Sequence, residues 1–177
     1  MWSIALMFDK LKRKALKRQT DKNLENRDLS QRNEPLKTIG YLVDEVIFQD
    51  FERLYGFSEE LGLLRKNTTV YTFIELKKKA PSLIQNQINN RHFTWKGNIN
   101  NQNANEFLDN PFDVLVGIYT SKNEFLDVMM SLSKAKFKVG FAGADERLFD
   151  LLIDIDLQDF DKFKSEFIKY LRILNKI

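Results

Sequence analysis

Residues 113–119 read DVLVGIY, and none of the six residues after the opening aspartate is charged. A continuous apolar run of this kind is typical of a strand that is covered on both faces of a parallel sheet. Asn123 then offers a helix cap, and a second strand-like run, FKVGF, with one charged residue, follows the helix at 137–141. This strand–helix–strand order predicts a βαβ unit, in which the two strands are parallel.

The same alternation extends in both directions from this unit. Further strands are predicted at 38–43 (TIGYLV), 69–74 (TVYTFI), 92–96 (HFTWK) and 149–155 (FDLLIDI). Helices are expected from Phe48 to Leu61 and from Pro81, with Leu83, Ile84 and Ile88 on its apolar face, and an Asn-rich loop at 97–105. We therefore predict an α/β fold, a small three-layer Rossmann-like sandwich with a mainly parallel sheet of five or six strands.

The closing helix, expected at 159–175, has the clearest buried face. Its large apolar residues recur at intervals of three and four, which places them on one side: Phe160, Phe163, Phe167, Tyr170, Leu171 and Leu174. The chain holds fifteen Phe, so aromatic side chains are expected to form much of the interior.

A segment of different composition precedes this domain. Residues 1–18 contain neither Gly nor Pro, and one helical stripe collects Ile4, Phe8, Leu11 and Ala15. The periodicity fades over residues 19–37, where Pro35 marks a boundary. We predict a basic helical arm and linker at 1–36, followed by an α/β domain at 37–177 that folds without the arm.

The arm carries the positive charge of the chain. Residues 1–37 hold ten Lys or Arg against five Asp or Glu, whereas residues 38–177 hold eighteen against twenty. Six cations are expected to bind an anionic partner: Lys10, Lys12, Arg13, Lys14, Lys17 and Arg18. Nucleic acid or the ribosome, an anionic membrane surface and an acidic protein all fit this charge. Alternatively, the apolar stripe of the arm packs on the protein's own domain.

Polar residues follow several of the predicted strands. Ligands of open parallel sheets bind at the carboxyl ends of strands, so a ligand crevice is expected to collect Asp44, Thr120, Ser121, Asn123 and Asp154. Hydroxyls and a helix N-terminus at 120–123 suit an anion. Strand-end carboxylates could hold a divalent cation. Carboxylates are also common at these positions because they solvate turns and interact favourably with helix dipoles. We therefore predict no metal.

Several chemistries are excluded by what the chain lacks. It has no Cys and a single His, His92, so thiolate catalysis and multi-histidine metal sites are excluded. Gly140 and Gly143 belong to no glycine-rich phosphate motif. We expect no catalytic residue and no cofactor. The positive charge follows the apolar start instead of preceding it, which is the reverse of a secretory signal, and a cytoplasmic location is expected.

Two resemblances can be identified in these segments. The pattern from FDVLV at 112–116 through SKAKFKVG at 133–140 to DLLID at 150–154 resembles a family of small uncharacterised bacterial proteins without assigned activity. The stretch FDVLVGIYTSKNEFLDVMMSLSKAKFKVGF at 112–141 is also similar to the N-terminal half of heptosyltransferase-type glycosyltransferases. The catalytic acid of that family sits in a glycine–aspartate turn after the first strand. Gly40 lies inside the strand here and Asp44 follows without that turn, so no catalytic role is transferred.

Together these observations lead to one expected function and one alternative. We expect a non-enzymatic interaction or accessory protein, positioned on an anionic partner by its arm, in the cytoplasm, at the inner face of the membrane or on the ribosome. The alternative is a small-molecule or nucleotide-binding domain that uses the strand-end crevice, related to a degenerate glycosyltransferase half.

Overall fold

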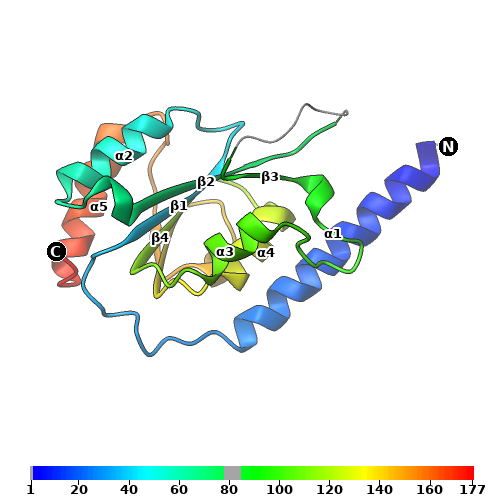
Figure 1. Cartoon of the computed structure of the whole chain (residues 1–177), viewed down its shortest axis with the longest axis horizontal. Coiled ribbons are helices and arrows are strands. Elements are labelled where there is room, and N and C mark those ends of the chain that lie inside the picture. Colours follow the sequence, from blue (N-terminus) through cyan, green and yellow to red (C-terminus); the bar gives the residue numbers. More distant parts are fainter. Residues whose placement is uncertain (1, 78–84) are drawn as a thin grey trace.

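The computed structural model describes residues 2–77 and 85–177 (Figure 1). Within this part of the chain, six strands form one sheet in the order β3-β2-β1-β4-β5-β6, and all neighbouring pairs are parallel. They are β1 (Ile39–Asp44), β2 (Thr68–Ile74), β3 (Gln87–Asn89), β4 (Val114–Ile118), β5 (Phe137–Phe141) and β6 (Leu151–Ile153). The predicted parallel α/β fold is confirmed, and the order of strands is that of Rossmann folds.

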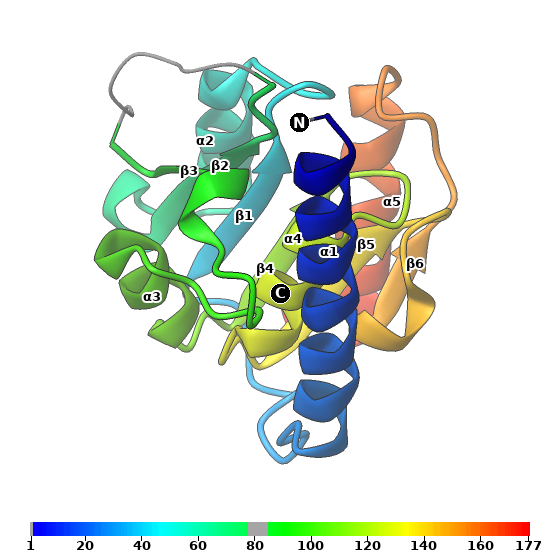
Figure 2. The same ribbon diagram turned by 90° about the vertical axis from the view of Figure 1, so that its right-hand side faces the viewer.

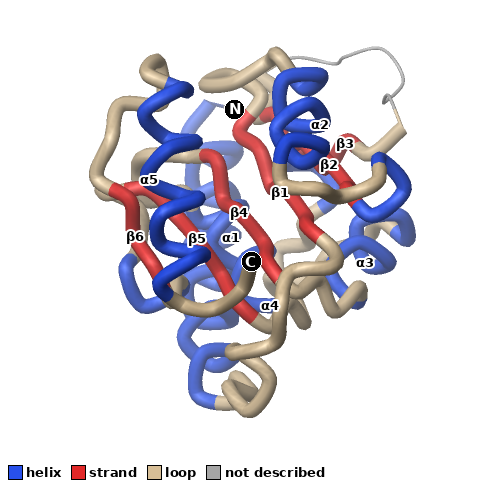
Figure 3. The backbone as a smooth tube through the Cα atoms, turned by 90° about the vertical axis from the view of Figure 1, so that its left-hand side faces the viewer, coloured by secondary structure: helices blue, strands red, loops and turns tan. Residues whose placement is uncertain are grey.

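Helices cover both faces of the sheet. They are α1 (Trp2–Glu25), α2 (Phe51–Glu60), α3 (Gln102–Asp109), α4 (Glu124–Leu132) and α5 (Phe160–Ile173), with short 3₁₀ turns at Arg65–Asn67, Asn90–His92 and Glu146–Leu148. The helices α2 and α5 lie on one face of the sheet (Figure 3), and α3 and α4 lie on the other, with α1 running across α4 (Figure 2).

The buried face of α5 confirms most of its sequence prediction. Phe160, Phe163, Phe167 and Leu171 are buried against the sheet and α2, whereas Leu174 is 40% exposed because the helix has ended at Ile173. Phe57 of α2 is in edge contact with the rings of Phe160, Phe163 and Phe167. These aromatic contacts fix α2 beside α5.

The structure corrects the sequence prediction between β2 and β4. Residues 92–96 are not a ladder strand: a 3₁₀ turn ends at His92, and Phe93 makes an isolated bridge with Ile99. Ile88 lies in β3, a three-residue edge strand, and not on a helix. The predicted helix start at Pro81, with Leu83 and Ile84, lies outside the described residues. The Asn-rich loop gives way to α3, which buries Ala104, Phe107 and Leu108.

The helix α1 is longer than predicted and packs through another face. It continues to Glu25, and from Lys12 onward it lies along α4, with Leu16 fully buried in the cluster that also contains Phe125 and Met129. The predicted stripe is exposed instead: Ile4, Phe8 and Leu11 are 55, 56 and 50% exposed. The N-terminal end of α1 extends beyond the rest of the chain (Figure 1).

One ion pair and several hydrogen bonds hold the linker after α1 against the body. Arg27 pairs with Asp150 on the way into β6, and the ammonium of Lys176 donates to the carbonyls of Arg32 and Glu34. The carboxylate of Asp113 accepts hydrogen bonds from the N–H groups of Lys37 and Thr38 at 2.9 Å. The linker therefore follows a defined path from the end of α1 to the start of β1.

The boundary between residues 36 and 37 stays a prediction, which thermal unfolding of residues 37–177 tests. A cooperative transition is the expected outcome, because the sheet, α2 and α5 all lie inside that span. Truncation uncovers the surface of α4 beneath Leu16 and removes the partner of Asp150, so the transition is expected at a lower temperature than in the full chain. An insoluble or molten product would show that α1 is required for the core to form.

Candidate functional site

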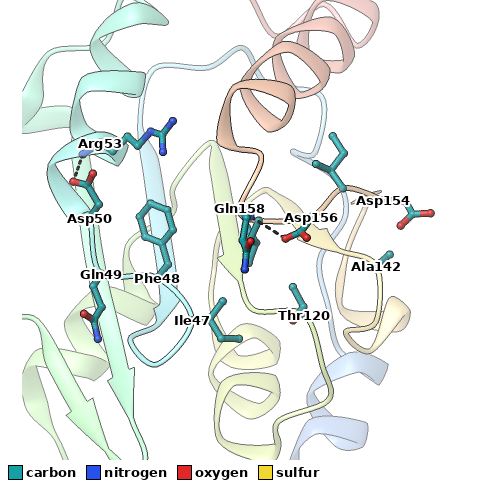
Figure 4. A pocket seen from close by; sticks show the side chains of 12 residues that line it. Ile47, Phe48, Gln49, Asp50, Arg53, Thr120, Ala142, Asp154, Asp156 and Gln158 are labelled. Carbon is teal, nitrogen blue, oxygen red and sulfur yellow. Dashed lines mark hydrogen bonds between the residues drawn. The ribbon is translucent and has the colours of Figure 1, made fainter.

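A hollow of about 790 Å³ lies at the carboxyl ends of the strands, on the face covered by α2 and α5. The loop after β1 contributes Ile47 and Phe48, and the loop after β6 contributes Gln158 (Figure 4). Thr120 follows β4 and Ala142 follows β5, so loops from four strands meet here. This is the switch point between β1 and β4, where the chain turns from one half of the sheet to the other.

The helices that begin at this edge leave no free N-terminus for a phosphate. Asp50 accepts from the N–H of Arg53 at the start of α2, and Asp159 accepts from the N–H of Lys162 at the start of α5. Asn123 accepts from the N–H groups of Phe125 and Leu126 at the start of α4. Each terminus is therefore capped by its own side chain, and two of the caps carry a negative charge that disfavours an anion.

The hollow holds one cation among several carboxylates. Arg53 lies above the ring of Phe160, 4.5 Å from its centroid, and its guanidinium pairs with Asp161 at 3.6 Å. Asp154 and Asp156 lie on the opposite side (Figure 4). Among the residues that the structure describes, no three carboxylates or imidazoles come together as a metal site would require.

Of the five residues predicted for the strand-end crevice, the structure brings two into this hollow, Thr120 and Asp154. Asp44 is partly buried beside the start of its loop, where its carboxylate accepts from the N–H of Val46. Burial raises the pKa of Asp44, and Glu75 adds to the increase. Ser121 is exposed, and Asn123 is engaged as the cap of α4.

The six predicted cations of α1 divide into three groups. Lys12 and Arg13 contact the body: Lys12 donates to the carbonyl of Asn90, and Arg13 pairs with Asp9, Glu75 and Glu124. Lys17 lines a smaller cavity between α1 and α4. The other three cations, Lys10, Lys14 and Arg18, are exposed, as is Lys17.

Lys14 and Arg18 belong to an apolar and basic surface that sequence reasoning did not assemble. A groove of about 490 Å³ runs between α1 and the turn after Phe93, and its walls include Leu11, Lys14, Arg18, Trp95 and Lys96. Trp95 is 65% exposed. The sequence analysis placed the HFTWK segment in a sheet strand, whereas Trp95 and Lys96 lie in a turn beside α1.

The strand order and the layered helices define a three-layer, Rossmann-like α/β protein without the phosphate-binding loop of dinucleotide-binding domains. Residues 12–174 match the model of a family of unknown function (DUF6913), and the chain belongs to this family. The match includes α1 from Lys12, whose ammonium donates to the carbonyl of Asn90. No curated protein and no solved structure matches the chain. The similarity to heptosyltransferase-type enzymes is therefore not shown by these comparisons.

Proposed function

We propose that this protein is a non-enzymatic interaction protein that docks on an anionic membrane surface through the outward face of α1. The observation that carries the proposal is a stripe of exposed side chains on the side of α1 opposite α4. It starts with apolar residues and ends with cations: Ile4, Met7, Phe8, Leu11, Lys14, Arg18 and Lys22.

The spacing explains why this stripe is separate from the packing face. Its members follow one another at intervals of three or four residues and therefore share one side of the helix. The residues that contact the body, among them Arg13, Leu16 and Thr20, have the same spacing with a different phase. From Ile4 to Lys22 no member of the stripe is a carboxylate, and the exposed Glu25 follows three residues after Lys22. Asp9 and Asp21 pair with Arg13 and Arg147, not with the cations of the stripe.

The order of side chains along the stripe favours a bilayer over nucleic acid. Phosphate contacts account for nonspecific nucleic-acid binding and need no apolar neighbours. A membrane surface uses both kinds of residue: cations contribute about 1 kcal/mol each near anionic lipid, and apolar side chains enter the boundary of the acyl region. Trp95 and Lys96 extend the same chemistry next to Leu11.

The proposal places the protein at the inner face of a membrane as a peripheral protein, since anionic lipids and juxtamembrane cations meet there. Among residues 2–77 and 85–177, no helix combines the length and the apolar character needed to cross a bilayer. Attachment through α1 is consistent with that finding.

The test is sedimentation with vesicles of phosphatidylglycerol and phosphatidylcholine, compared with phosphatidylcholine alone. The full chain is expected to bind only the anionic vesicles. Changing Ile4, Phe8 and Leu11 together to serine is expected to weaken binding about tenfold or more, because the apolar insertion is lost. The matched control changes Val46, Leu64 and Ile173 to serine, since these residues are equally exposed elsewhere on the surface.

Two outcomes would overturn the membrane proposal. One is an equal loss of binding in the control variant, which would show that serine at any exposed apolar position weakens vesicle binding. The other is binding to a single-stranded RNA oligonucleotide that the serine changes leave intact and that falls with salt at about −0.7 per phosphate in a log–log plot. The second result would assign the cations to nucleic acid.

A second candidate function is the binding of a small molecule in the strand-end hollow, where loops from four strands converge. The capped helix termini disfavour a nucleotide phosphate, so an uncharged or cationic ligand fits the Asp154 and Asp156 side better. Titration calorimetry with adenosine and with ADP tests whether a phosphate is disfavoured. Tighter binding of ADP than of adenosine would contradict this electrostatic argument.

A further inference from the structure

The groove between α1 and the turn after Phe93 has walls of one charge. Among the described residues, those that line it include four cations and no carboxylate; the cations are Lys14, Arg18, Lys22 and Lys96. None of these cations forms an ion pair with another described residue. Of the two acids that follow on α1, Asp21 pairs with Arg147 and Glu25 does not line the groove. An anion would therefore meet four uncompensated positive charges here.

Apolar side chains share the walls of this groove with the cations. Leu11 and Ala15 line it from α1, and Trp95 lines it from the turn. Leu11 is 50% exposed and Trp95 is 65% exposed, so much of their apolar surface meets solvent. Tryptophan is enriched at membrane interfaces, where its ring contacts lipid and its N–H stays near the headgroups. The apolar lining therefore favours the phosphate of a lipid over that of a soluble ligand.

The turn that forms the second wall of the groove is held in place from both sides. Phe93, at its start, is buried, and its ring is in edge contact with that of Phe125. Gly97 has a φ of 88°, and its N–H donates to the carbonyl of Thr94 at 3.0 Å. A Cβ at Gly97 would lie 3.1 Å from the carbonyl oxygen of Ala15, so the turn rests on the backbone of α1. The groove is therefore formed before a ligand arrives, which lowers the entropic cost of binding.

We propose that this groove binds the headgroup of an anionic phospholipid that carries two phosphates, such as diphosphatidylglycerol. The inference rests on the proposed function, because the groove lies along the outward face of α1. Lys14, Arg18 and Lys22 follow one another at intervals of four residues, so each is about 6 Å from the next along the helix axis. One phosphate fits between two neighbouring cations, and the row of three therefore accommodates two phosphates. Lys96 adds a fourth cation from the turn, and Trp95 meets the lipid beside the headgroup.

Flotation of the full chain with two sets of vesicles tests the proposal. One set holds phosphatidylglycerol and the other diphosphatidylglycerol, each in phosphatidylcholine and at the same total negative charge. Binding to diphosphatidylglycerol is expected to be about fivefold tighter or more, because the row of cations meets both phosphates of one molecule. Arg18→Gln should remove most of this preference. Lys10→Gln is the matched control, since Lys10 is an exposed cation of α1 outside the groove, and its loss should weaken binding to both lipids alike.

The fluorescence of Trp95 gives a second readout. The chain holds two tryptophans, and Trp2→Phe leaves Trp95 as the single emitter. Its emission is expected to shift to shorter wavelength on diphosphatidylglycerol vesicles and to be quenched by brominated acyl chains, because the ring moves from water to lipid. Inorganic pyrophosphate without vesicles is expected to leave the emission unchanged.

Equal affinity for the two lipids at matched charge would overturn the headgroup assignment and leave the proposed membrane function intact. The same conclusion follows if Lys10→Gln lowers the preference as much as Arg18→Gln, or if brominated lipid fails to quench Trp95. A shift of the Trp95 emission with pyrophosphate alone, as large as that with vesicles, would assign the groove to a soluble diphosphate instead. Absence of binding to either set of vesicles would contradict the proposed function itself, and the headgroup assignment with it.

Discussion

Replacing Phe167 with alanine is expected to lower the free energy of unfolding by about 3–5 kcal/mol. Phe167 is fully buried in the middle of α5, and its ring lies 5.7 Å from that of Phe57 and 5.5 Å from that of Phe163. Truncation removes the ring and leaves a cavity that neither the sheet nor α2 can fill without moving. A loss of this size is a large part of the typical stability of a domain, about 5–15 kcal/mol.

The matched control for Phe167 is Ile173→Ala on the same helix. Ile173 is 65% exposed, so its truncation is expected to change the free energy of unfolding by less than about 0.5 kcal/mol. Urea unfolding of both variants at one pH measures the difference. A loss below about 1 kcal/mol for Phe167→Ala would contradict the packing of α5 described above.

The elements that were predicted correctly from sequence are those whose pattern of apolar residues matches the pattern of burial. The strand at 137–141 was predicted with the bounds that the structure shows, because all five residues are buried and only Lys138 interrupts the hydrophobic run. The α5 helix was predicted because its apolar residues keep a strict helical spacing. In both cases the local sequence pattern corresponds directly to which residues are buried in the tertiary structure.

The elements that were missed depend on contacts that a local pattern does not record. The three residues of β3 form a strand because they pair with Thr72–Ile74 at the sheet edge. The helix α3 is rich in Asn and buries only three apolar residues. The packing face of α1 was not predicted, because the helix packs on α4 with Leu16 and Thr20, while its most apolar residues point outward.

The strand-end hollow and the buried Asp127 differ in how far the sequence could reveal them. The strand-end residues were identifiable from fold rules, but whether Asp44 or Thr120 enters the hollow depends on loop paths. Asp127 was recognisable in principle, because it stands inside the EFLDVMMSL helix between residues that are nearly all apolar. A helix that is apolar on all sides is buried, so its carboxylate had to be buried too.

Asp127→Asn is expected to raise the free energy of unfolding at neutral and alkaline pH. Burial raises the pKa of Asp127 to about 7, and the charges of Asp145 and Glu124 add to the increase, whereas the neighbouring Tyr119 hydroxyl and the N–H of Asn123 oppose it. A carboxyl with a raised pKa contributes its full stability below its unfolded pKa and loses that contribution as pH rises through the folded pKa. Asparagine resembles the uncharged carboxyl in size and hydrogen bonding, and it does not ionise.

The stability difference between Asp127→Asn and the unmodified protein should therefore be small near pH 4 and reach on the order of 4 kcal/mol above pH 7. Urea unfolding at about pH 5 and about pH 8 measures it, and the gap between the two proteins is expected to widen by on the order of 3 kcal/mol. Glu146→Gln should show no such widening, because that carboxylate is exposed. A constant gap would mean that Asp127 ionises normally. A widening gap would show that the chain retains a buried carboxylate at a cost in stability, as proteins do where a side chain serves a ligand.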